Sequence, residues 1–336
     1  MTAPFTAGRP WGALVAVYFV IIGLPSGLGL VTWGLGRLGG PGTRLRRYTD
    51  PLSAATLVAI SVLLVTDLGR PERFFLMLTR FDNLGSPIAV GAKLIALKLA
   101  LLVVAIWAVE RYRRLNTVAA RGYERGGTGA VRTGTLTIEP PASRRSARDA
   151  AATGTSGPPG PEVGTAVGAA LMPIVGWGLL ATSFALALYP AAVLSRTWSS
   201  PLAATSGAGL LFLLTSLLLG AAAIGLLAAT APARLGLSGL LRPVRRLLLG
   251  LLGAYAITLV FEALSLIGDP RHSRTVAELS TGAQAQLWWL AVVAVGLVVP
   301  AAVLAIERRR AFVAGAAVAV VVGACAARFL LFSVGG

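Results

Sequence analysis

Residues 201–230 read PLAATSGAGLLFLLTSLLLGAAAIGLLAAT, a stretch that contains no charged side chain. A helix rises about 1.5 Å per residue, so about 20 apolar residues cross the hydrocarbon layer of a bilayer, which is about 30 Å thick. Similar runs recur along the chain, and they are too long to be membrane-spanning strands. The pattern therefore predicts membrane-spanning helices as the basis of the fold.

The composition agrees with this prediction. The 336 residues are 56% apolar and 13% charged, whereas soluble domains carry about 25% charged residues. We predict an all-α integral membrane protein of about eight transmembrane helices. The predicted helices cover residues 11–37, 51–68, 87–109, 166–192, 201–230, 241–267, 286–306 and 311–332.

Local signals support some of these helices. Asp50 before Pro51, and Ser86 before Pro87, each combine a side-chain N-cap with a proline at the first helical position. In the first helix the small-residue stretch 23–29 would let another helix approach closely, and Pro25 predicts a kink.

The arginines predict the orientation. They lie mostly between the apolar runs, which indicates membrane topology rather than nucleic-acid binding. Alternate connections hold 20 arginines, while the other connections and the chain ends hold 8. The smaller set is Arg9, Arg70, Arg73, Arg80, Arg196, Arg271, Arg274 and Arg328. The positive-inside rule then places both termini outside the cytoplasm.

Three parts follow along the chain. Residues 1–110 hold the first three helices, with an interfacial segment at 69–86 on the outer side. Residues 111–165 are rich in Gly, Ser, Thr, Pro and Arg, which predicts a disordered cytoplasmic loop, or alternatively an arginine patch on anionic lipid. Residues 166–336 hold the other five helices. The similar ends of the second and sixth helices suggest two parallel four-helix halves, or a chance match.

The residue counts restrict the redox groups that the chain could hold by itself. A single cysteine, Cys325, cannot bind an iron-sulfur cluster, and a single histidine, His272, cannot supply the histidine pair that buried b-type haems commonly use. We expect no haem, iron-sulfur cluster or other metal centre in this chain.

The connection after the second helix carries the most distinctive residues. It runs from Asp67-Leu-Gly-Arg70-Pro71 through an apolar aromatic stretch to Ser86-Pro87. An acid, arginines and apolar side chains at the membrane surface suit a ligand with a polar ring and an apolar tail. The alternative is an interfacial amphipathic helix with internal ion pairs.

This segment resembles the NrfD or polysulfide-reductase membrane-subunit (PsrC-like) family. Further similarities are Tyr18 to Gly23 with Gly27 in the first helix, Tyr189 with Trp198 and Pro201, and Trp288 to Pro300 in the seventh helix. The resemblance covers most of the membrane portion, while residues 111–165 lie outside it.

The resemblance implies a non-autonomous subunit of a quinone-linked respiratory oxidoreductase in the bacterial cytoplasmic membrane. It would bind an exchangeable menaquinone or ubiquinone near the outer face. There it would exchange electrons with a four-cluster ferredoxin-like iron-sulfur subunit, which serves a catalytic, often molybdopterin-containing, subunit. In such a complex the cofactors perform the redox step, and this chain positions the ring and moves protons.

By the same resemblance, the candidates near the quinone are Tyr18, Asp67, Arg70 and Tyr189. Tyrosine and arginine can donate hydrogen bonds to a quinone carbonyl, and a carboxylate can accept a proton when quinol is oxidised. For the two tyrosines the alternative is an anchoring role in the aromatic belt at the membrane surface.

Three further residues are candidates for proton transfer. Lys98 lies about 16 Å deep in the third helix, where a lysine costs about 2.5–3.5 kcal/mol, so it should face the bundle interior or a water cavity. Its alternative role is a structural pair with an unidentified acid. Glu262 could relay protons, or bind a neighbouring backbone group or arginine. His272 could be a proton exit, or a plain surface histidine.

Two other functional classes compete with this interpretation. A secondary transporter would explain the repeat, the kinked first helix and the mid-membrane lysine. A structural anchor for an extracytoplasmic enzyme would need no quinone site.

Overall fold

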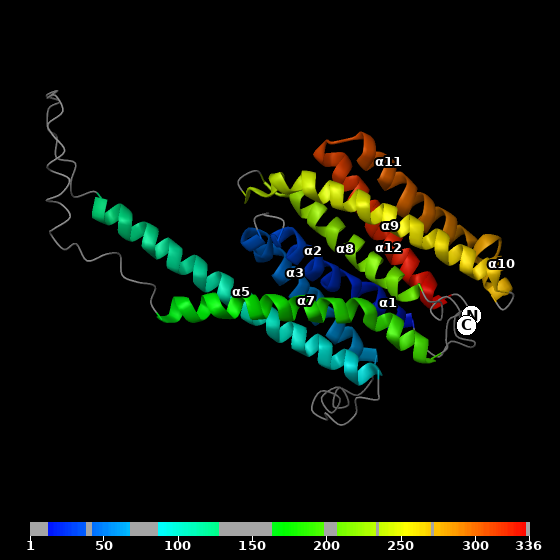
Figure 1. Ribbon diagram of the computed structural model, residues 1–336, viewed down its shortest axis with the longest axis horizontal. Coiled ribbons are helices and arrows are strands. Elements are labelled where there is room, and N and C mark those ends of the chain that lie inside the picture. The colour runs from blue at the N-terminus through cyan, green and yellow to red at the C-terminus, as the bar shows by residue number, and fades with distance from the viewer. Residues whose placement is uncertain are drawn as a thin grey trace. The chain divides into compact units, whose positions relative to one another are not determined.

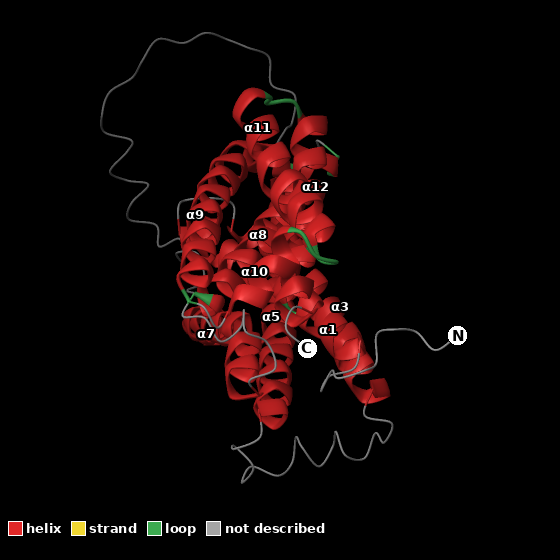
Figure 2. Ribbon diagram, turned by 90° about the vertical axis from the view of Figure 1, so that its right-hand side faces the viewer, coloured by secondary structure: helices red, strands yellow, loops and turns green. Residues whose placement is uncertain are grey.

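The computed structural model describes residues 13–37, 42–67, 87–127, 163–197, 207–232, 235–269 and 272–333. In these ranges every regular element is a helix, as Figure 2 shows. The elements are α1 (Ala13–Ile21), α2 (Gly23–Arg37), α3 (Gly42–Asp67), α5 (Pro87–Gly127), α7 (Val163–Thr197), α8 (Ala208–Thr230), η3 (Leu237–Leu240), α9 (Leu241–Gly268), α10 (Ser273–Ser280), the π-helical η5 (Leu287–Val298), α11 (Val299–Ile306) and α12 (Arg310–Ser333).

Eight helical segments of the described chain are long and apolar enough to cross a membrane, so the predicted all-α class and number of spans are confirmed. The segments are Val17–Arg37, Leu45–Thr66, Ala89–Arg111, Met172–Ser195, Ala208–Thr230, Leu237–Gly268, Leu287–Ile306 and Arg310–Phe332. The extracytoplasmic position of the termini and the division into two four-helix halves stay predictions.

The contacts divide the chain into two units, residues 1–106 with 176–336 and residues 107–175. In the first unit α8 is the central helix, because 72% of its most apolar window is buried, the largest fraction of any span. It packs against α2, α9 and α12, and its neighbours can be followed in Figure 1. The second unit contains the end of α5, to Gly127, and the beginning of α7, from Val163.

The closest helix crossing joins α2 to α8. A Cβ atom on Gly27 would overlap the backbone of Ser216, and one on Gly220 would overlap the backbone of Gly27. Only glycine allows the two backbones to lie this near, and such contacts stabilise helix pairs in membranes by close packing. The predicted close approach along residues 23–29 is confirmed.

The first span is broken rather than continuous. Between α1 and α2, Ile22 adopts a turn, three residues before Pro25. Proline has no backbone N–H to donate to the carbonyl four residues earlier, so it weakens the helix over the preceding turn. The Ser26 hydroxyl donates to the carbonyl of Ile22 at 2.7 Å, so this backbone acceptor at the break has a hydrogen-bond partner. The kink predicted from Pro25 is therefore present as a break.

The predicted start of the second span is wrong. The helix α3 begins at Gly42, and Pro51 lies inside it rather than at its first position. Membrane helices tolerate an internal proline where neighbouring helices and hydroxyl side chains satisfy the freed backbone groups. The Thr49 hydroxyl, two residues before the proline, donates to the Leu45 carbonyl of the same helix at 3.2 Å. As a consequence, Asp50 caps no helix and its side chain is buried within the bundle.

Other parts of the chain also differ from the sequence prediction; α7, for example, covers Val163–Thr197 rather than residues 166–192. α5 continues to Gly127 instead of ending near residue 109, and the added residues include good helix formers such as Ala, Arg, Leu and Glu without proline. The connection after the sixth span contains the short helix α10. The predicted interfacial segment 69–86 and most of the loop 111–165 lie outside the described residues.

Arg328, counted above among the outer charges, is not in a connection. It lies in α12 and is completely buried. A charge that is satisfied by other helices does not report on the membrane surface, so it does not belong in the topology count. Without it, the arginine bias favours the same orientation more strongly.

Gly27→Ala is expected to lower the free energy of unfolding by about 1–3 kcal/mol, because the added methyl group overlaps the α8 backbone. Gly34→Ala on the same helix is the matched control, since a Cβ atom there meets no other atom within 4 Å. The control should be neutral or stabilising by up to about 1 kcal/mol. Unfolding of the purified protein in detergent measures both; equal effects would contradict the crossing.

Candidate functional site

Lys98 is completely buried in the interior of the bundle, as its position along the span predicts. Its Nζ atom donates to the carbonyl oxygen of Pro25 at 2.6 Å and to Ser183 Oγ at 2.9 Å. The Ser53 hydroxyl donates to the same Pro25 carbonyl at 3.2 Å. The Pro25 carbonyl, near the break in the first span, therefore accepts one hydrogen bond from a lysine of α5 and another from a hydroxyl of α3.

Asp50 is the acid that sequence reasoning did not assign to Lys98. The two side chains line one small cavity, with room for about one water molecule at 10 Å³, and lie near enough to attract each other electrostatically. Arg46 is a second cation near Asp50. Asp50 is 7% exposed, and none of the described residues gives its Oδ2 atom a hydrogen-bond partner. The arrangement can hold a charge pair, and also a proton that moves through one water.

Arg328 is the second buried cation, and it joins three helices. Its Nε donates to Thr215 Oγ1 at 2.9 Å, and Nη1 donates to the Phe19 carbonyl at 2.9 Å. Nη2 donates to the Phe212 carbonyl at 2.8 Å and to the Ser216 hydroxyl. Gly23 leaves the space that the guanidinium fills, because a Cβ atom there would overlap it.

Two of the four predicted quinone residues lie together. Tyr18 on α1 and Tyr189 on α7 are 4% and 6% exposed, and their side chains interact with each other. The Tyr189 ring packs against Gly91 of α5, where a Cβ atom would overlap its hydroxyl end. Phe19 extends the cluster, with ring centroids 4.8 Å from Tyr18 and 5.8 Å from Tyr189.

The other two predicted quinone residues are not described to the same extent. Asp67 is the last residue of α3, but its side chain is outside the described part of the structure. Arg70 lies entirely outside the described residues. Whether they join the tyrosine pair stays a prediction.

The remaining candidates for proton transfer lie in the second half of the chain. Glu262 on α9 is 5% exposed, and its Oε1 atom lies against Gly207, at the beginning of α8. His272 precedes α10, and its Nδ1 is 3.5 Å from Asp269 Oδ2. Neither residue contacts Lys98, so the three candidates do not form one cluster. Within the described ranges, no three His, Cys, Asp or Glu residues gather where they could hold a metal ion.

Comparison with known families assigns the chain. The family model of polysulphide reductase, NrfD, matches residues 3–336. The chain belongs to this family. NrfD proteins are membrane subunits of quinone-linked oxidoreductases, which generally work with iron-sulfur and molybdopterin subunits. Comparison with curated proteins finds no significant match.

Sequence reasoning missed Asp50 and Arg328 for different reasons. The buried position of Asp50 was missed because Pro51 follows it, and an acid before a proline resembles a helix N-cap. Arg328 carried the same signal as Lys98, a charge within an apolar run, but its position near the end of the chain suggested a surface residue. In the NrfD fold of this chain, both are buried polar groups of the bundle interior.

Asp50→Asn and Lys98→Met are each expected to destabilise the protein, because each removes an opposite charge that attracts the other buried side chain. The double variant should lose about 0.5–3 kcal/mol less than the sum of the single losses, as contacting residues do. Detergent unfolding measures this coupling energy.

The control for this cycle combines Asp50→Asn with Arg309→Lys, which changes an exposed arginine. These two effects should add to within about 0.5 kcal/mol. If the effects of Asp50→Asn and Lys98→Met add equally well, the two side chains do not act as a pair.

Proposed function

We propose that this NrfD subunit binds membrane quinone beside Tyr18 and Tyr189 and exchanges electrons between the quinone pool and a ferredoxin-like iron-sulfur partner. The pair of buried tyrosines, which interact with each other and both pack against Phe19, is the observation that carries the proposal. It consists of two residues from distant parts of the chain that the family resemblance assigns to the quinone. The bound quinone is menaquinone or ubiquinone.

The position of the pair suits a quinone ring. Tyr189 lies eight residues before the end of α7, which is about 12 Å along the helix axis, so it is inside the apolar layer but near one surface. A quinone has two carbonyl acceptors and no donor in its oxidised form, and tyrosine hydroxyls supply donors. The quinone supplies the redox chemistry, while these side chains bind and orient its ring.

The orientation follows from the arginine distribution. If the arginine-rich connections face the cytoplasm, the ends of α3 and α7 and the beginning of α5 face outward. The quinone site and its iron-sulfur partner then lie on the extracytoplasmic side of the bacterial cytoplasmic membrane. A catalytic molybdopterin subunit completes the complex.

Lys98, Glu262 and His272 are proposed to move protons for the quinone reaction. Lys98 and Asp50 support this role best, because their cavity has room for about one water molecule between buried ionisable groups. The same cavity is too small for a transported solute. This observation and the family membership favour the oxidoreductase subunit over a secondary transporter.

Tyr189→Phe and Tyr18→Phe are each expected to weaken binding of a soluble quinone analogue by about tenfold, the equivalent of one lost hydrogen bond. Asp67→Asn and Arg70→Ala are expected to weaken the same binding. Titration of decylubiquinone into the purified chain, with and without its iron-sulfur partner, measures the dissociation constant. Tyr48→Phe is the matched control, because Tyr48 belongs to α3 and lies only partly buried. A well-folded wild type that binds no quinone even with its partner would leave only the structural-anchor role.

Lys98→Met and Glu262→Gln are expected to slow quinone turnover in the assembled complex by about 100-fold, the lower range for loss of a proton-transferring group. The quinone affinity of Lys98→Met should stay unchanged. Glu278→Gln, which changes an exposed acid of α10, is the control and should keep normal turnover. Normal turnover in folded Lys98→Met protein would assign Lys98 to structural support of the broken first span.

A further inference from the structure

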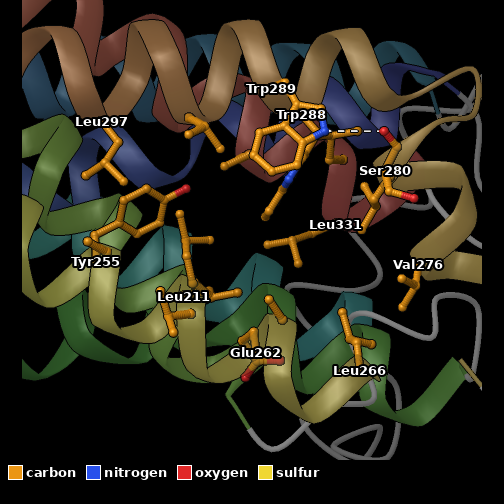
Figure 3. Close-up of a pocket in the computed structure, with 18 of the residues that line it drawn as sticks. Leu211, Tyr255, Glu262, Leu266, Val276, Ser280, Trp288, Trp289, Leu297 and Leu331 are labelled. Carbon is orange, nitrogen blue, oxygen red and sulfur yellow. Dashed lines mark hydrogen bonds between the residues drawn. The ribbon is translucent and has the colours of Figure 1, made fainter. Parts of the chain in front are cut away.

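A cavity of about 390 Å³ lies in the second half of the chain, far along the sequence from the tyrosine pair. It is enclosed by α8, α9, α10, the π-helical η5 and α12, and Figure 3 shows its lining. Its walls are almost wholly apolar, with Leu211, Leu259, Leu331, Trp288 and Trp289 among the lining residues. A volume of this size is in the range of ligand sites.

The Tyr255 hydroxyl lines this cavity and, like Oε1 of Glu262, has no hydrogen-bond partner among the described residues. Tyr255 is 2% exposed and projects from α9 toward the cavity (Figure 3). Among the described residues, none accepts a hydrogen bond from its hydroxyl or donates one to it. An unpaired hydroxyl in an apolar surrounding costs about 1–3 kcal/mol, so such groups normally have a partner. This donor is therefore free to bind an acceptor that the described part of the chain does not provide.

The charge behind Tyr255 favours an acceptor with negative partial charge. The Arg328 guanidinium interacts electrostatically with Tyr255, and its hydrogen-bond partner Thr215 also lines the cavity. A carbonyl oxygen bound to the Tyr255 hydroxyl would lie in the positive potential of Arg328. A ligand made only of hydrocarbon would not accept a hydrogen bond from the Tyr255 hydroxyl, and the positive potential of Arg328 would not attract it.

The cavity can be reached from the bilayer. Three of its lining residues, Ile267, Val260 and Trp289, are 68%, 59% and 52% exposed on the surface of spans that face lipid. A ligand that enters here must dissolve in the membrane. The flat indole of Trp288 lies on the cavity wall in Figure 3, where it can pack against a flat ring.

We propose that this cavity is a second binding site for a lipid-soluble quinone, whose ring carbonyl accepts a hydrogen bond from Tyr255. The ring packs beside Trp288 and the first part of the apolar tail fills the space between α9 and η5. Glu262 lies on the same face of α9, two turns from Tyr255, and lines the other end of the cavity. Tyr18 and Tyr189 are not among the lining residues of this cavity, whereas Glu262 is shared with the proton-transfer residues proposed above. The inference therefore goes beyond the proposed function at the tyrosine pair and does not depend on it.

The test is isothermal titration of decylubiquinone into the full chain in quinone-free phosphatidylcholine nanodiscs, with empty nanodiscs as the blank. The wild type is expected to bind two molecules per chain. Tyr255→Phe should weaken one of the two sites about tenfold and leave the other unchanged. Tyr189→Phe should show the opposite pattern.

A melting measurement and one additional variant guard against loss of folding. In the absence of quinone, Tyr255→Phe should melt at or above the wild-type temperature, because it removes an unpaired buried hydroxyl. A merely structural tyrosine would melt lower after this change. Ala263→Phe should fill the cavity and abolish one binding event while leaving Tyr255 in place.

Unchanged binding at both sites in Tyr255→Phe would overturn the proposal. It would also be overturned if 1-decanol, which has the tail but no ring, displaces decylubiquinone from the site equally well, because the cavity would then hold a lipid chain. If only the Tyr255-dependent site is found, the proposed function at Tyr189 fails and this inference stands.

Discussion

Two buried cations hold the first span of this protein at its break. In hydrocarbon no water can satisfy a charged side chain, so a buried cation must find its hydrogen-bond acceptors within the protein. Lys98 donates to the Pro25 carbonyl on one side of the break, and Arg328 donates to the Phe19 carbonyl on the other. These bonds come from the third and eighth spans, so the break connects distant parts of the chain. The rest of the bundle interior is arranged around these contacts.

The same constraint explains the small residues near the break. Gly23 leaves space for the Arg328 guanidinium, and Gly27 brings α2 against α8. Glycine lowers the helix propensity at these positions. It permits the guanidinium contact at Gly23 and the contact with the α8 backbone at Gly27, and a methyl group would block both. The protein therefore gains a firmly positioned first span, which carries Tyr18 and Phe19 to the proposed quinone site.

The two halves of the chain differ in how they expose polar groups. In the first four spans Tyr18 and Tyr189 interact with each other, and Lys98 has both a carbonyl and a hydroxyl partner. In the second half Tyr255 faces an apolar cavity and lacks a partner among the described residues. A satisfied pair must rearrange to bind a ligand, whereas an unpaired donor is ready to bind one. This difference is the physical basis for proposing two sites of one ligand class.

The sequence by itself determined the membrane class, the eight spans, the close approach of the first helix and the burial of Lys98. These features depend on local quantities, namely the length of apolar runs, proline and glycine positions, and the cost of a charge at mid-membrane. The family resemblance was also present in the sequence. Only the tertiary structure decided that Asp50 faces Lys98, that Arg328 reaches Phe19, and that Tyr255 lines a cavity. Such partnerships depend on the direction of side chains from helices that are distant in the sequence, and helical periodicity alone does not specify which faces meet.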